Sequence, residues 1–70
     1  MIPLDLADIG KENVIKKVGG SPDVKKHLED LGFTAGGPVT VVSVMGGNVI
    51  VKVKESRIAI SREMARRIMI

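Results

Sequence analysis

Residues 27–44, HLEDLGFTAGGPVTVVSV, change from a helical pattern to a strand pattern across a few glycines. Apolar residues at helical spacing precede Gly32, and valines dominate after Pro38. A change of hydrophobic period within about six residues predicts a helix joined directly to a small sheet. This corner contains no nucleophile, no phosphate-binding loop and no cluster of metal ligands. The segment therefore indicates an architecture before it indicates a chemistry.

The residues before this corner carry signals for both ends of one helix. Ser21 is a residue type that caps helix N-termini, and Pro22 suits the first turn. Gly32 suits the left-handed position that follows a helix C-terminus, where Phe33 can fold back onto Leu28 as in a Schellman motif. We therefore expect a helix of about ten residues that ends at Gly32.

The residues after the corner are typical of three strands. A two-residue turn at Gly46–Gly47 places one set of valines on the core face. These core valines are Val42, Val44, Val49, Val51 and Val53. In this register Val42 pairs with Val51. A second turn at Glu55–Ser56 pairs Val53 with Ile58 and puts Ile58 and Ile60 on the same face, so both turns predict one common core side.

An earlier strand at residues 13–18 and a short helical turn within residues 61–67, followed by Ile68–Ile70, complete the expected elements. Closure of the sheet removes edges that so short a sheet could not otherwise protect. We expect one mainly β domain over residues 1–70. It is a small closed barrel of about five strands with one inserted α-helix and a short helical turn near the C-terminus.

Composition limits the function classes. The 70 residues include one Phe, no Trp, no Tyr and no Cys, so aliphatic side chains must fill the core, and a disulfide scaffold or a cysteine nucleophile is excluded. The net charge of +3 is scattered along the chain, which is weak evidence for a polyanionic partner. No apolar run reaches the roughly 20 residues of a membrane helix, and residues 1–5 do not begin a signal peptide. We expect a soluble, cytoplasmic protein.

Two chemical readings compete on the helix. Asp23, His27 and Asp30 are spaced for one helical face, which would suit a ferrous or zinc ion. A closed metal site requires three or four ligands, however. A lone His beside Lys26 is more typical of a solvated surface. We therefore predict no metal ligand here. The serines have only His27 as a base, and no acid is placed to orient it. We therefore expect no enzyme activity and no resident cofactor.

The order of these features resembles the FeoA family over nearly the whole chain. The resemblance is carried by the spacing from Leu4 to Gly10, the pair Gly19–Gly20, the segment LEDLGFTAG at 28–36, and RIAISREMARRIMI at 57–70. It implies a cytosolic SH3-like barrel that accompanies the ferrous-iron permease FeoB, and an association with transition-metal transport. Similar domains occur in metal-responsive repressors. The local sequence differs from the family pattern in the loop at Ala35–Pro38.

The function that we expect is that of an accessory protein of ferrous-iron uptake that binds and modulates the FeoB permease. In the predicted register, apolar and cationic side chains share the sheet face opposite the core, which suits an acidic or amphipathic partner segment. These candidate partner-binding residues are Val39, Val41, Met45, Ile50, Lys52, Lys54 and Arg57, with Lys25 and Lys26 on the exposed helix side as the second choice.

Two alternatives to this function stay open. One is a small regulatory barrel, and the other is a nucleic-acid-binding barrel, since small barrels bind strands and the pI is about 9.6. The second lacks exposed aromatic side chains for base stacking. A structural alternative to the binding face also remains, in which the helix or the N-terminal segment covers that face and forms a second small core.

Overall fold

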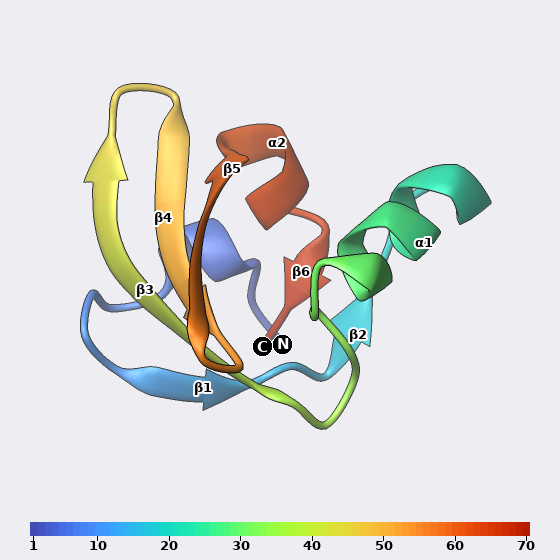
Figure 1. Cartoon of the computed structure of the whole chain (residues 1–70), viewed down its shortest axis with the longest axis horizontal. Helices are drawn as coiled ribbons and strands as arrows, with labels where there is room; N and C mark the ends of the chain where they lie inside the picture. The colour runs from blue at the N-terminus through green and yellow to red at the C-terminus, as the bar shows by residue number, and fades with distance from the viewer.

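The computed structural model describes all 70 residues and contains six strands, two α-helices and one 3-10 turn (Figure 1). In chain order the elements are η1 (Leu4–Leu6), β1 (Glu12–Val14), β2 (Lys17–Val18), α1 (Pro22–Asp30), β3 (Pro38–Met45), β4 (Asn48–Val53), β5 (Ser56–Ser61), α2 (Arg62–Ala65) and β6 (Ile68–Met69). One sheet has the strand order β1-β3-β4-β5, and a two-stranded sheet pairs β2 with β6. All three ladders of the larger sheet and the single ladder of the smaller one are antiparallel.

Helix α1 begins and ends where its capping residues predict. The Ser21 side-chain oxygen accepts a hydrogen bond from the Val24 N–H at 3.4 Å. Gly32 has a φ of 110°, and the Phe33 N–H donates to the Leu28 carbonyl at 3.0 Å. That bond is the long-range one of a Schellman motif. The predicted helix, its cap and its stop are therefore confirmed.

The β3–β4 hairpin departs from the predicted register at a β-bulge. Val44 pairs with Val49 as expected, but the register shifts between Val41 and Ser43. Val42 is the extra residue, and Val41 takes the place opposite Val51 that the sequence assigned to Val42. A one-residue shift exchanges the two faces of a strand. The side chains of β3 before Val42 therefore occupy the faces opposite to those predicted.

The burial of the β3 valines follows this shift. Val39 is 1% exposed and Val41 is 2% exposed, so both lie in the core and not on the outer face. Val42 is only half-buried, and Val44, near the hairpin end, is 41% exposed. The bulge therefore makes the prediction wrong for Val42, which was placed in the core, and for Val39 and Val41, which were placed outside it. Val44 keeps its predicted pairing with Val49 but lies outside the core because it is near the hairpin end.

The β4–β5 turn lies one position earlier than predicted, at Lys54–Glu55. Val53 pairs with Ser56, where the sequence paired it with Ile58. The resulting register differs from the predicted one by two residues, and a shift of two preserves which face each side chain occupies. Ile60 is accordingly buried and Ile58 is half-buried, on the predicted side. Lys54 adopts a positive φ of 55°, a conformation that is uncommon for lysine and could not be predicted from its residue type.

The predicted strand at residues 13–18 is divided between two sheets. β1 pairs with β3, and β2 pairs with β6, which follows the short helix α2. Ile15, between the two strands, is 1% exposed and is thus directed into the core. One segment therefore joins the larger sheet to the smaller one, and this accounts for six strands where about five were expected.

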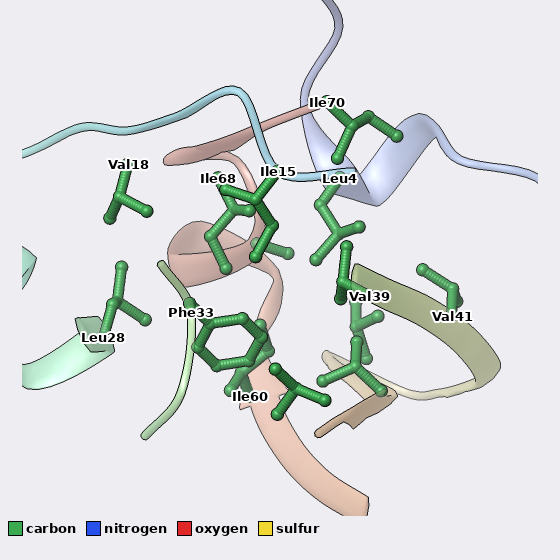
Figure 2. Close-up of a cluster of buried hydrophobic side chains, with 14 residues drawn as sticks. Leu4, Ile15, Val18, Leu28, Phe33, Val39, Val41, Ile60, Ile68 and Ile70 are labelled. Carbon is green, nitrogen blue, oxygen red and sulfur yellow. The ribbon is translucent and has the colours of Figure 1, made fainter. Parts of the chain in front are cut away.

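A single hydrophobic core lies between the two sheets and beneath the helices. Figure 2 shows the Phe33 ring surrounded by aliphatic side chains from both sheets, from α1 and from η1. The 14 core residues are Leu4, Ile15, Val18, Leu28, Phe33, Val39, Val41, Val49, Val51, Val53, Ile60, Ala65, Ile68 and Ile70. No polar or charged residue is buried, so the side chains of the interior stabilise the fold by hydrophobic burial.

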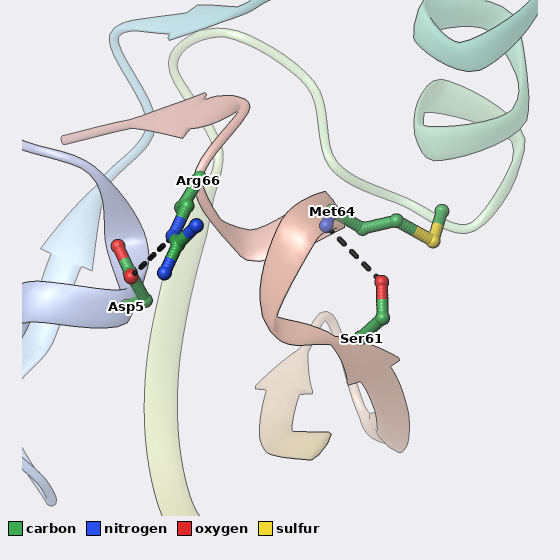
Figure 3. A network of polar contacts seen from close by, with 4 residues as sticks. All are labelled: Asp5, Ser61, Met64 and Arg66. Carbon is green, nitrogen blue, oxygen red and sulfur yellow. Dashed lines mark hydrogen bonds and ion pairs between the residues drawn. The ribbon is translucent and has the colours of Figure 1, made fainter. Parts of the chain in front are cut away.

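The two ends of the chain are fastened side by side (Figure 1). Ile2 and Ile70 exchange two backbone hydrogen bonds of 2.9 Å each. Figure 3 shows a further link, in which the Arg66 Nε donates to the Asp5 carboxylate at 3.3 Å.

No helix combines the length and the apolar character needed to cross a membrane.

Candidate protein-binding surface

The outer face of the four-stranded sheet carries side chains from all four strands. The strand register places Glu12, Thr40, Lys52 and Arg57 in one row across the sheet. Ile50 lies in the next row and pairs with Ser43 on β3 and with Ala59 on β5. These rows arise because the two hairpins put alternate residues of each strand on the same face.

This outer face carries three cations and one carboxylate, Glu12, which lies in the row of Lys52. Lys52, Lys54 and Arg57 are exposed. The one salt bridge of the structure joins Arg66 to Asp5, so none of the three cations takes part in an ion pair. Cations that lack a partner within the fold remain free to attract an acidic partner.

The structure keeps some of the predicted partner-binding residues on this face and removes others. Those kept on the outer face or at its margins are Met45, Ile50, Lys52, Lys54 and Arg57. Met45 is 67% exposed near the β3–β4 turn, and Ile50 is half-buried. Val39 and Val41 do not belong to the surface, because the bulge turns both into the core. Lys25 and Lys26 are exposed on α1, as the second choice requires.

No second core covers the outer face. Helix α1 packs near β2, at the other side of the molecule (Figure 1). Lys52, Arg57 and Ala59 are exposed, which would not be the case beneath a packed helix. The alternative in which the inserted helix or the N-terminal segment buries this face is therefore wrong.

Sequence reasoning missed a hollow of about 320 Å³ between the two helices. Its lining residues are Asp23, Val24, His27, Glu63, Met64 and Arg67. The spacing of Asp23 and His27 predicted that they share one helix face, but nothing local could predict that α2 would bring Glu63 to the same place. The structure contains no group of three His, Cys, Asp or Glu side chains arranged to hold a metal ion. The hollow has mixed charge and two apolar side chains.

The single aromatic side chain of the protein is not available for binding. Phe33 is 0% exposed, at the centre of the core. Single-stranded nucleic acids are held largely by stacking of bases on exposed aromatic rings. The positive face therefore lacks the second component that a nucleic-acid surface of this size would use.

Comparison with known proteins identifies the family of this fold. The model of the FeoA domain matches residues 2–70. The chain belongs to the FeoA family. A protein of Methanocaldococcus jannaschii named Fe(2+) transport protein A is 34% identical over 70 residues, which are 100% of this chain and 85% of that protein. The resemblance inferred from the sequence is therefore confirmed.

Solved FeoA structures share the whole architecture. One crystal structure, of an iron uptake regulatory protein (FeoA), superimposes with a TM-score of 0.88 at 25% identity and covers 97% of this chain and 92% of that one. The FeoA of Stenotrophomonas maltophilia in complex with zinc, described as a procaryotic SH3 domain protein, gives a TM-score of 0.85 at 24% identity. That likeness covers 99% of this chain and 88% of the other. The predicted SH3-like barrel is thus confirmed.

Proposed function

We propose that this FeoA-family protein is an accessory of ferrous-iron uptake that binds the cytosolic part of a FeoB-like permease and modulates it. The observation that carries the proposal is family membership over residues 2–70, together with a relative named for Fe(2+) transport. The name of one solved FeoA structure, which refers to iron uptake, supports the same role. We propose that the protein acts in the cytoplasm and by binding rather than by catalysis.

The outer sheet face is the surface that we assign to this interaction. It offers one exposed methionine, Met45, and one half-buried isoleucine, Ile50. It also offers three cations that take part in no ion pair, Lys52, Lys54 and Arg57. Methionine adapts its shape to different partners, and cations steer the approach of an acidic segment. A partner segment that is acidic and partly apolar matches this chemistry.

Retention of the permease's cytosolic region on immobilised protein tests the proposal. Reversing two charges with Lys52→Glu and Lys54→Glu should weaken retention about tenfold or more at low salt, because the partner loses two attractive charges and meets two repulsive ones. The thermal midpoint should change little, since exposed side chains away from special contacts contribute little to stability.

Lys16→Glu and Lys17→Glu provide the matched control. Both lysines are exposed, and the change in net charge is the same, but they lie beside the smaller sheet. Retention of the permease region by this control at near wild-type level is the expected result. If both double variants bind equally well, the outer face is not the binding surface. If the wild-type chain itself retains no permease region, the proposed function is wrong.

A further inference from the structure

Strand β5 ends the four-stranded sheet and has no strand on its other side (Figure 1). In an antiparallel ladder, alternate residues direct their N–H and C=O groups to the neighbouring strand. The two-residue turn at Lys54–Glu55 makes the flanking residues the first hydrogen-bonded pair. The β5 residues that bond to β4 are therefore Ser56, Ile58 and Ile60. The backbone groups of Arg57 and Ala59 point away from the sheet.

These outward backbone groups have no partner within the protein. The 19 backbone hydrogen bonds that lie outside helices and strands include none from Arg57 or Ala59. The side-chain hydrogen bonds include none to these groups either. Both residues are exposed. Two N–H donors and two C=O acceptors are thus displayed in line along one accessible edge, which is the arrangement to which an added strand binds.

Three of the usual protections of a sheet edge are missing from β5, and the charged side chain that it does carry is Arg57. Natural edges are blocked by proline, by a bulge, by shortness of the strand or by charged side chains. β5 spans six residues, contains no proline and pairs with β4 without a register shift. The opposite edge strand, β1, has only three residues. The side chain at the middle of the open edge is that of Ala59, which is too small to obstruct a neighbour.

The core is also incompletely covered on this side. Val41, Val51 and Ile58 lie in one row on the inner face of the sheet. The first two are 2% and 0% exposed, whereas Ile58, on the edge strand, is only half-buried. An apolar side chain from a strand beside β5 would therefore lengthen this row by one residue and cover Ile58.

We propose that β5 accepts, by strand addition, an extended partner segment in which acidic and apolar residues alternate. The outward side chains of such a strand would lie next to Arg57, where an acidic residue would form a cross-strand pair with an unpaired cation. Lys52 lies on the strand beyond β5 and adds to the positive charge. Its inward side chains would lie next to Ile58. The segment would be about six residues long, because it must match the length of β5.

The inference rests on the proposed function for one point only, namely that the segment belongs to the permease. A second copy of this chain fits the edge less well. Antiparallel pairing of β5 with itself would place the Arg57 and Lys52 side chains of both copies on one face, and like charges on neighbouring strands are destabilising. Charge complementarity therefore selects an acidic segment from another protein.

Amide hydrogen exchange of the full ¹⁵N-labelled chain tests the site directly. The probe is a blocked synthetic peptide with the sequence Gly-Ser-Val-Glu-Val-Glu-Val-Gly-Ser, and the control peptide has Lys in place of Glu. With the Glu peptide in excess, exchange of the Arg57 and Ala59 amides should slow about tenfold or more, because both become hydrogen-bonded. The Ile58 amide, already bonded to β4, should change little. The Lys peptide should give no such protection.

Two substitutions at Ala59 separate the backbone from the side chain. Ala59→Pro removes the outward N–H while leaving the bonds to β4 in place, and it should weaken peptide binding about tenfold or more. Ala59→Val keeps the N–H and should bind as the wild type does. Arg57→Glu should also weaken binding, whereas Lys17→Glu, with the same change in net charge, should not. Arg57→Glu keeps the test decisive if the proline variant does not fold.

Several results would overturn the inference. Peptide binding without protection of the Arg57 and Ala59 amides would move the site elsewhere, and so would full binding by a folded Ala59→Pro variant. Protection that appears without peptide and grows with protein concentration would identify a second copy as the occupant. If Ala59→Pro retains the permease region as well as the wild type does, this inference fails while the proposed function stands. If the Glu peptide protects the Arg57 and Ala59 amides of the wild type but the wild type retains no permease region, the proposed function fails while the strand-addition site stands.

Discussion

Replacing Val41 by Thr should destabilise the protein, whereas the same replacement at Val44 should not. Val and Thr have nearly the same shape, so the substitution exchanges a methyl group for a hydroxyl group and changes little else. Val41 is 2% exposed and lies opposite Val51 in the core. Val44 is 41% exposed, close to the end of the β3–β4 hairpin. The pair therefore compares a buried and a solvated hydroxyl group on one strand.

The expected magnitude follows from the burial of the two positions. A hydroxyl group buried without a hydrogen-bond partner costs about 1–3 kcal/mol in protein substitutions. A domain of this size loses roughly 4–8 °C in its thermal midpoint for each kcal/mol. Val41→Thr should therefore lower the midpoint by roughly 4–24 °C. Val44→Thr should change the unfolding free energy by no more than about 0.5 kcal/mol.

Thermal and urea denaturation followed by circular dichroism would measure both variants, with Val42→Thr as a third member of the series. The half-buried position of Val42 predicts an intermediate cost. A hairpin without the bulge would put Val42 in the core and Val41 outside, and would leave the pairing of Val44 with Val49 unchanged. If Val42→Thr is more destabilising than Val41→Thr, the reasoning from the bulge is refuted.

Three further outcomes are expected. Gly32→Ala should lower the unfolding free energy by about 1–2 kcal/mol, because φ is 110° there. Gly47→Ala, at a position with open space and no positive φ, should change it by no more than about 0.5 kcal/mol. Equal costs in denaturation would contradict the role of Gly32 as the helix stop. Ser61→Ala should cost about 1 kcal/mol because it removes the side-chain acceptor of the Met64 N–H (Figure 3), and an unchanged melting curve would show that this cap contributes nothing. His27→Ala should leave any zinc affinity measured by calorimetry unchanged, since no trio of ligands exists; loss of a tight stoichiometric site would contradict this.

Helix α1 could be predicted from the sequence because its signals are local. Ser21, Pro22 and Gly32 each act on backbone groups within a few residues, so their types determine the cap, the first turn and the stop. The Gly46–Gly47 turn was likewise found, because one of its residues adopts a positive φ that glycine allows without strain. Local chemistry of this kind is legible in a single sequence.

The bulge at Val42 and the turn at Lys54 were not predictable in the same way. Val42 sits in a run of valines, so either of two neighbours could face inward, and only the packing of the whole sheet decides between them. Lys54 adopts its positive φ without being Gly, Asn or Asp. The bulge determines which β3 residues form the candidate surface, which is why Val39 and Val41 were wrongly assigned to it. The earlier turn changes the pairing of β5 but not the face that each of its side chains occupies.

The open edge of β5 and the hollow between the helices also lay beyond sequence reasoning, for a different reason. Each depends on which elements fail to pair or on which distant elements meet. Hydrophobic alternation reports the faces of a strand but not the number of its neighbours. The candidate surface could thus be predicted in its cations, Lys52, Lys54 and Arg57, but not in its boundary.

The hydrogen bonds between Ile2 and Ile70 join residues at almost the greatest separation that the chain allows. The β3–β4 and β4–β5 hairpins, by contrast, close across two residues each. Loop-closure entropy rises with the length of chain enclosed, so we expect the hairpins to form early and the two ends to join after the folding barrier. Contacts made after the barrier slow unfolding without speeding folding. The hairpins would then determine how fast the barrel forms, and the junction of its two ends would determine how long it lasts.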